Sequence, residues 1–116
     1  MALNENFTVL VLYPDGRLES RKSTIAGFKD IVGSQTEGTS IGMVGKFEKL
    51  ALFYPEGMAG DFNEKATVVY QWLKYRSRKV EGEARGICIL VDDDEELTVE
   101  SWALFEERIR DKMESC

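Results

Sequence analysis

Residues 63–79, NEKATVVYQWLKYRSRK, constrain the fold of this chain more than any other stretch. Asn63 can accept a hydrogen bond from a free amide of a first helical turn, which is typical of a residue that caps a helix. Glu64 follows at the end of a helix where negative charge is favoured, and three cations lie near the other end, where positive charge is favoured. The stretch therefore predicts a helix.

Two apolar stripes run along this predicted helix. At about 100° per residue, the first stripe holds the alanine, valine, tyrosine and leucine at positions 66, 69, 70 and 73. The second stripe holds Val68, Trp72 and Tyr75. Together they are wider than the stripe of a helix that lies on one core. We expect the first to pack on a sheet. The second is either core, covered by the last helix through Trp102 and Phe105, or an interface with another molecule, for which a two-fold homodimer is the default.

Runs rich in β-branched and aromatic residues predict the strands. The first run, FTVLVLY, is apolar nearly throughout, which favours a central position in a sheet. The Pro-Asp-Gly turn at residues 14–16 then returns the chain into a short partner strand. A later run, GICILV, is continuously apolar and typical of a buried strand. The predicted strands span residues 7–13, 17–20, 39–44, 50–54 and 86–91.

Two further helices are predicted from caps and periodicity. Ser23 or Thr24 can cap a short helix that ends before Gly33, with apolar residues 25, 28, 31 and 32 on its inner face. Thr98 can cap a final helix whose apolar positions fall on one face. That face holds Val99, Trp102, Phe105, Ile109 and Met113. Residues 34–38, SQTEG, have the composition of a loop.

The predicted order is β-β-α-β-β-α-β-α, which indicates an α+β domain. We expect a mostly antiparallel sheet of about five strands with about three helices on one face. The 116 residues suit a single domain over residues 1–116, with residues 1–6 and 114–116 loose at its ends. Hydrophobic residues make up 43% of the chain and charged residues 31%, which indicates a folded protein.

The composition argues against several classes of function. The chain has no histidine, which removes the commonest general base and metal ligand, and its two cysteines are far apart. Neither glycine-rich phosphate-binding pattern occurs. We therefore expect no enzyme, no metal and no cofactor. The net charge of −6 does not suit a bare phosphate backbone and suits a partner with a basic surface.

Localisation follows from the cysteines and the apolar runs. Cys88 lies in an apolar run and is expected to be a buried thiol, while Cys116 is the last residue. Unpaired thiols fit a reducing compartment. No signal peptide pattern occurs, and no apolar run approaches the roughly 20 residues that span a bilayer. The sequence therefore predicts a cytoplasmic protein without a membrane contact.

An acidic run is the sharpest local feature of the sequence. It comprises Asp92, Asp93, Asp94, Glu95 and Glu96. Such a patch could dock on a basic partner or hold a hard cation, although its spacing does not match a helix–loop–helix calcium loop. It could also be a solvated loop whose acids favour the start of the next helix. We predict that it binds a basic partner protein.

A basic group closes the central helix. Tyr75 interleaves with Arg76, Arg78 and Lys79, which would allow a ring to stack beside a bound phosphate. The same cations could simply favour a helix C-terminus. The alternative function is therefore binding of a small ligand such as a nucleotide, at a dimer groove that contains these residues.

The chain also resembles a small uncharacterised family carried by phages and plasmids and catalogued as a domain of unknown function. The resemblance rests on VLVLYPDGRLE, on FKDIVG, on the helix start Asn63-Glu-Lys-Ala66-Thr67 and on GICILV. It implies a non-enzymatic accessory protein in the host cytoplasm. Such a protein would bind and modulate a host macromolecule, for example as an anti-defence inhibitor.

Overall fold

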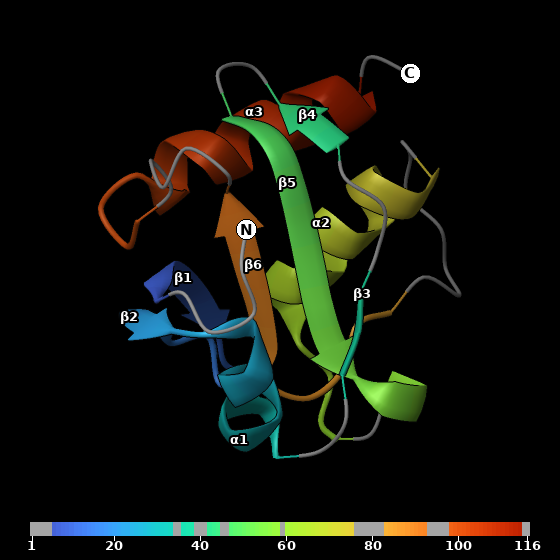
Figure 1. Cartoon of the computed structure of the whole chain (residues 1–116). Helices are drawn as coiled ribbons and strands as arrows, with labels where there is room; N and C mark the ends of the chain where they lie inside the picture. The colour runs from blue at the N-terminus through green and yellow to red at the C-terminus, as the bar shows by residue number, and fades with distance from the viewer. Residues whose placement is uncertain are drawn as a thin grey trace.

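One antiparallel sheet with helices on both faces organises the fold (Figure 1). The computed structural model describes residues 6–33, 36–38, 42–44, 47–58, 60–75, 83–92 and 98–114. The strands are β1 (Phe7–Leu12), β2 (Leu18–Ser23), β3 (Thr36–Gly38), β4 (Gly42–Val44), β5 (Phe47–Pro55) and β6 (Cys88–Asp92). The helices are α1 (Phe28–Val32), α2 (Glu64–Tyr75) and α3 (Trp102–Glu114), with 3-10 turns η1 (Ile25–Gly27) and η2 (Glu56–Met58).

The strand order is β2-β1-β6-β5-β3, and β4 also pairs with β5. Every pairing between these strands is antiparallel. The α+β class and the antiparallel sheet are therefore confirmed. Both β1 and β6 are interior strands, as their continuous apolar runs predicted. Within the described residues, no helix has the length and apolar character needed to cross a membrane.

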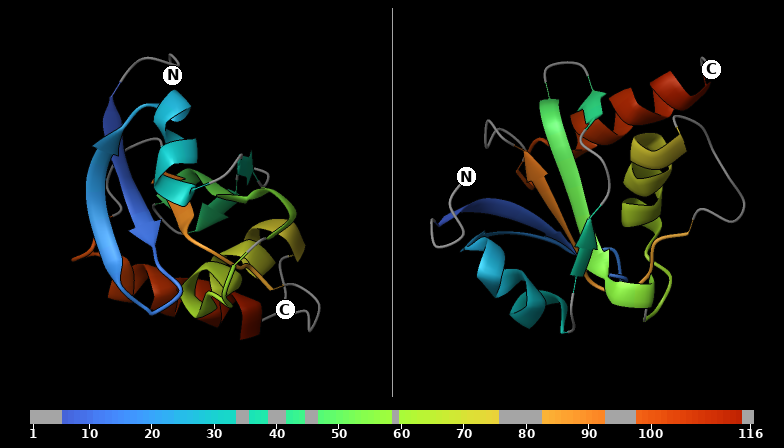
Figure 2. Two further views of the ribbon diagram at one scale, coloured as in Figure 1. Left: turned by 90° about the horizontal axis from the view of Figure 1, so that it is seen from below. Right: turned by 45° about the vertical axis from the view of Figure 1, so that its right-hand side comes forward.

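Helices cover both faces of the sheet, so the expectation of helices on one face was wrong. Side chains alternate between the faces of a strand, and β1 is apolar on both. Val9 and Val11 pack in a cluster with Phe28 and Val32 of α1. The leucine at position 10 packs instead in the cluster of α2 and α3. Figure 2 shows α1 on one side of the sheet and the other two helices on the opposite side.

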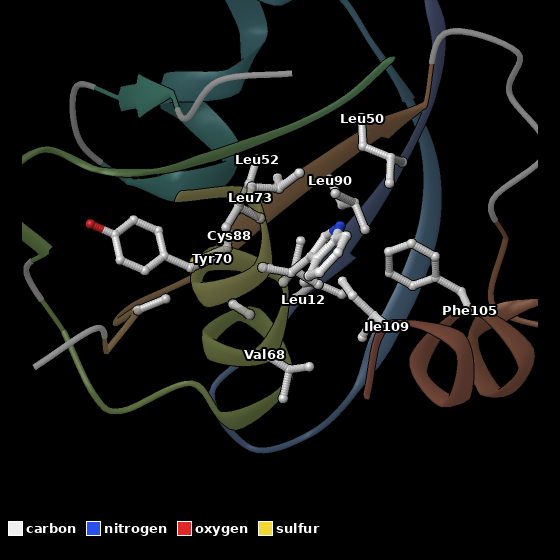
Figure 3. Close-up of a cluster of buried hydrophobic side chains, with 14 of the residues drawn as sticks. Leu12, Leu50, Leu52, Val68, Tyr70, Leu73, Cys88, Leu90, Phe105 and Ile109 are labelled. Carbon is white, nitrogen blue, oxygen red and sulfur yellow. The ribbon is translucent and has the colours of Figure 1, made fainter. Parts of the chain in front are cut away.

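The larger of the two clusters lies between the sheet and the α2–α3 layer. Leu12 and Leu90 come from the strands and meet Phe105 and Ile109 of α3, all four of them at most 1% exposed (Figure 3). Burying one such side chain contributes about 1.5–3 kcal/mol. This layer holds the face of α2 that the sequence predicted to lie on a sheet.

The far edge of the sheet differs from the prediction. Residues 36–38 form β3 instead of a loop, and β4 lies in the second half of the strand expected over residues 39–44, whose first half is outside the described residues. Both short strands pair with β5, β3 opposite its end and β4 opposite its start. Each is only three residues long, and backbone pairing with the nine residues of β5 extends them into the sheet. The register of the β4–β5 pairing shifts between Gly42 and Val44.

The predicted turn between the first two strands is confirmed. The amide of Tyr13 donates to the Arg17 carbonyl at 3.0 Å, and the amide of Gly16 donates to the Tyr13 carbonyl at 3.0 Å. Gly16 has φ 93°, a left-handed conformation that glycine adopts without a steric penalty. The following strand is longer than expected, because β2 continues to Ser23.

The predicted caps are present at the helix starts. The amide of Ala66 donates to Asn63 Oδ1 at 3.1 Å. The amide of Gly27 donates to Thr24 Oγ1 at 3.1 Å, so Thr24 caps the 3-10 turn η1, while α1 itself begins after Gly27 without a side-chain cap. Thr98 exchanges hydrogen bonds with Ser101 just before α3. Four of the five apolar positions predicted for the inner face of that last helix are buried. The fifth prediction was wrong: Val99 lies in the preceding turn and is 39% exposed.

Candidate functional site

A cleft of about 470 Å³ opens beside the turn that joins β1 and β2. Its volume lies within the roughly 300–1,000 Å³ typical of small-ligand sites. Segments that are far apart in the sequence form its walls: the turn itself, the end of α1, and two glycine-containing stretches. The lining residues are Tyr13, Pro14, Asp15, Arg17, Val32, Gly60, Asp61, Gly86 and Ile87.

One wall is a rigid polar turn. Arg17 Nε lies 2.8 Å from Asp15 Oδ2, and the amide of Arg17 donates to Asp15 Oδ1 at 3.0 Å. The guanidinium lies over the Tyr13 ring, 4.4 Å from its centroid, as a cation–π contact. The hydrogen bond from the Arg17 amide, followed by that from its side chain, lowers the pKa of the Asp15 carboxyl. Asp15 and Arg17 thus neutralise each other within the turn.

Tyr13 contributes an aromatic side and a hydroxyl donor. Its hydroxyl donates to Glu19 Oε1 at 3.1 Å. Burial, with the Glu19 carboxylate as a second cause, raises the pKa of Tyr13. The phenol therefore keeps its proton at neutral pH, and the ring stays anchored to β2.

The floor of the cleft is bare backbone where two segments touch. The amide of Gly86 donates to the Asp61 carbonyl at 2.8 Å, and Phe62 bridges Arg85 in antiparallel fashion. A Cβ on Gly60 would lie 2.7 Å from the Cα of Gly86, and Gly60 has φ 126°. A side chain at this position would meet both backbone strain and a steric clash.

Asn63 fixes this floor from below. Its side chain is fully buried, and Nδ2 donates to the carbonyls of Leu12 and Gly86, both at 2.9 Å. Its Oδ1 caps α2 through the Ala66 amide. One amide group therefore ties the end of β1, the segment before β6 and the start of α2 together under the cleft.

Asp61 differs from the other charged residues that line the cleft, because its carboxylate forms no salt bridge with a described residue. Its side chain is exposed, and no ion pair of its carboxylate occurs among the described residues. Because Asp15 is paired with Arg17, Asp61 is the lining residue whose charge is not balanced by an ion pair among the described residues. The Lys65 ammonium lies beside the neighbouring turn, 3.7 Å from where a Cβ on Gly16 would stand. Such a site can hold a cationic group; the described residues contain no group of three or more metal-ligating side chains.

The predicted acidic site is described at one residue only. Asp92 is the last residue of β6 and pairs in register with Leu50. The other four acids, Asp93, Asp94, Glu95 and Glu96, lie outside the described residues. Partner binding through this run stays a prediction.

Val68 and Trp72 lie in the core. They are 7% and 9% exposed and belong to the cluster that holds Trp102 and Phe105 of α3. The structure thus supports the alternative in which the last helix covers this stripe, and it leaves these two side chains too buried to form an interface. For Tyr75 the structure describes only the backbone, and Arg76, Arg78 and Lys79 lie outside the described residues.

The sequence prediction missed the cleft. The only part of the cleft that a short sequence pattern indicated was the turn at residues 14–16, and the prediction treated this turn only as the connection between two strands. The floor depends on pairing between residues 60–63 and 84–86, which are far apart in the chain. Neither segment carries a periodicity that would predict this pairing.

Comparison with known proteins supplies no relative: no family model, curated protein or solved structure matches the chain. The resemblance to the phage and plasmid family therefore stays a prediction.

Proposed function

We propose that this chain is a non-enzymatic binding protein that receives a cationic side chain of a basic partner protein in the cleft at Asp61. The proposal rests on one observation: of the two carboxylates that line the cleft, one forms an ion pair and the other does not. Asp15 has its cation 2.8 Å away, whereas the Asp61 carboxylate has no ion pair within the described chain. A lysine or arginine side chain would supply the missing charge.

The other walls suit the stem of such a side chain. Val32 and Ile87 present apolar surface, and Tyr13 presents part of its ring. Lysine and arginine bury their methylene stems against apolar surface while the charged head reaches a polar partner. The cleft volume of about 470 Å³ can accommodate the head beside Asp61.

The net charge of −6 supports the same choice of partner. A negatively charged protein attracts a basic surface and accelerates encounter with it. The predicted acidic run at residues 92–96 would add a second contact to the same partner. The accessory role in a phage or plasmid, the host target and the cytoplasmic location rest on the resemblance and the sequence alone.

Nucleotide binding, the alternative prediction, has no support from the described cleft. Asp61 would repel a phosphate, and Arg17 is already paired with Asp15. The predicted basic site at residues 75–79 remains the only basis for it, and we do not propose it further.

Amide NMR shifts during titration would test the proposal. The probes are a lysine- and arginine-rich peptide and the free amino-acid amides of lysine and arginine. We expect shifts at Asp61, Gly86 and Ile87 that weaken with added salt. Asp61→Asn should weaken binding by at least about tenfold, because a hydrogen bond to a charged group contributes about 1.5–3 kcal/mol.

Glu107→Gln is the matched control, because it removes one exposed negative charge on α3, away from the cleft. Equal losses in the two variants would mean that overall charge alone attracts the peptide, which would refute the site. Tight binding of the free amides would identify a small amine as the ligand instead of a protein. Affinity capture with both variants would then select host proteins that depend on Asp61.

A further inference from the structure

β2 is an edge strand in regular register with β1, and the hydroxyl of its Ser20 accepts a hydrogen bond from the Val99 amide at 3.4 Å. It pairs with β1 in unbroken register from Leu18, opposite Leu12, to Ser23, opposite Phe7. The side chains of residues 19–22 are exposed, and the strand contains no proline. Figure 2 shows β2 at the outer margin of the sheet, beyond β1. Proteins usually protect such an edge with proline, a bulge, a very short strand or charged side chains, and of these devices β2 carries the charges.

The hairpin turn determines which backbone groups point outward. The amide of Tyr13 donates to the Arg17 carbonyl, so these two residues form a hydrogen-bonded pair. Hydrogen-bonded and non-hydrogen-bonded pairs alternate along an antiparallel ladder. Glu19 and Arg21 therefore bond to β1, whereas residues 18, 20 and 22 direct their amide and carbonyl groups away from the sheet.

The charges of β2 are complementary to those of a second β2 in one register only. With Ser20 on a two-fold axis, Glu19 lies opposite Arg21 of the second copy, and the contact repeats across the axis. This pair is of the non-hydrogen-bonded kind, in which the Cα atoms are about 4.5 Å apart and side chains are closest. A shift by two residues would instead place Glu19 opposite Glu19 or Arg21 opposite Arg21.

We propose that β2 pairs with β2 of a second copy of this chain, antiparallel about a two-fold axis at Ser20. The outward groups of residues 18, 20 and 22 then form about six main-chain hydrogen bonds across the axis. The two sheets become continuous. Because one strand per copy makes the contact, the dimer is reversible and its population rises with concentration.

Charge exchange tests the register. Sedimentation velocity should show a concentration-dependent dimer for the natural sequence. Arg21→Glu places like charges opposite each other twice, so we expect the dissociation constant to rise at least about tenfold. The double variant Glu19→Arg with Arg21→Glu restores opposite charges and should return the constant to within about threefold of the original value. Lys29→Glu, the same change of charge on exposed α1, should leave dimerisation unchanged.

Proline substitution tests the strand edge. Ser20→Pro removes an outward amide, so the protein should become monomeric and keep its circular dichroism spectrum. Arg21→Pro removes an amide bonded to β1 and should instead lower the unfolding temperature. A single-chain mass up to millimolar concentration would overturn the proposal. So would a dimer that survives Ser20→Pro, or a double charge variant that stays dissociated.

Discussion

Asn63 serves as both cap and cross-link. As a cap it satisfies one free amide of α2, and as a cross-link it satisfies the carbonyls of Leu12 and Gly86 in a fully buried site. A buried carbonyl that loses its donor costs about 1–3 kcal/mol. The residue therefore holds the frame of the cleft as well as the start of a helix.

Replacing Asn63 separates these two roles. We expect Asn63→Ala to lower the free energy of unfolding by about 3 kcal/mol, because the cap and both amide donors disappear. Asn63→Ser keeps an oxygen that can cap the helix but loses the two donors, so its loss should be about 2 kcal/mol. Urea unfolding would measure both. A loss of only about 1 kcal/mol in the alanine variant would show that capping is the whole contribution.

Only the local half of this role could be predicted from the sequence. The cap bonds to a residue three positions away, and the residue type and the following periodicity indicate it. The two carbonyl partners lie 51 and 23 positions away. No pattern near Asn63 identifies them, since they depend on how β1 and the segment before β6 meet.

Cys88 is a second buried residue with a measurable consequence. Burial raises the pKa of its thiol to about 12 from an ordinary value of 9.0. The unfolded chain therefore loses this proton at lower pH than the folded chain does. By linkage, the contribution of Cys88 is fully present below pH 9 and is lost as pH rises toward 12.

A pair of variants isolates this titration. In a Cys116→Ser background, the Cys88 thiol should react with Ellman's reagent only after denaturant is added at neutral pH. Between pH 9 and pH 12, the free energy of unfolding of this protein should fall relative to that of the same protein with Cys88→Ala. Rapid labelling of the folded protein at neutral pH would contradict the buried position.

α1 is a structural element in spite of its length of five residues. It covers the face of the sheet that α2 and α3 leave open, and Phe28 is 1% exposed. The Phe28 ring contacts Phe53 with centroids 5.0 Å apart. The sequence predicted the helix, its inner residues and its C-terminal glycine. It did not predict the face, although β1 is apolar on both sides and needs cover on both.

Phe28→Ala should therefore destabilise the protein by about 3–5 kcal/mol, as expected for a buried phenylalanine. Lys29→Ala is the control on the neighbouring exposed position and should change stability by no more than about 0.5 kcal/mol. Thermal unfolding followed by circular dichroism would compare the two. A small effect of Phe28→Ala would mean that the second cluster contributes little to stability.

Across the whole molecule, local signals predicted the elements and long-range pairing decided their arrangement. The class, the interior strands and the helix caps follow from patterns a few residues long. The cleft does not, because it joins the first turn, the end of α1 and the paired stretches near residues 60 and 86. β3 was missed for the same reason, since its conformation comes from its partner.

The place of β6 also has a consequence for assembly during synthesis on the ribosome. β6 lies between β1 and β5, yet it follows both of them in the chain. The β1–β2 hairpin and the pairing of β3 and β4 with β5 can each form early. The two parts join into one sheet only when β6, residues 88–92, has emerged and pairs with both β1 and β5. Until then the nascent chain carries two apolar strand edges, which are the kind of surface that molecular chaperones shield.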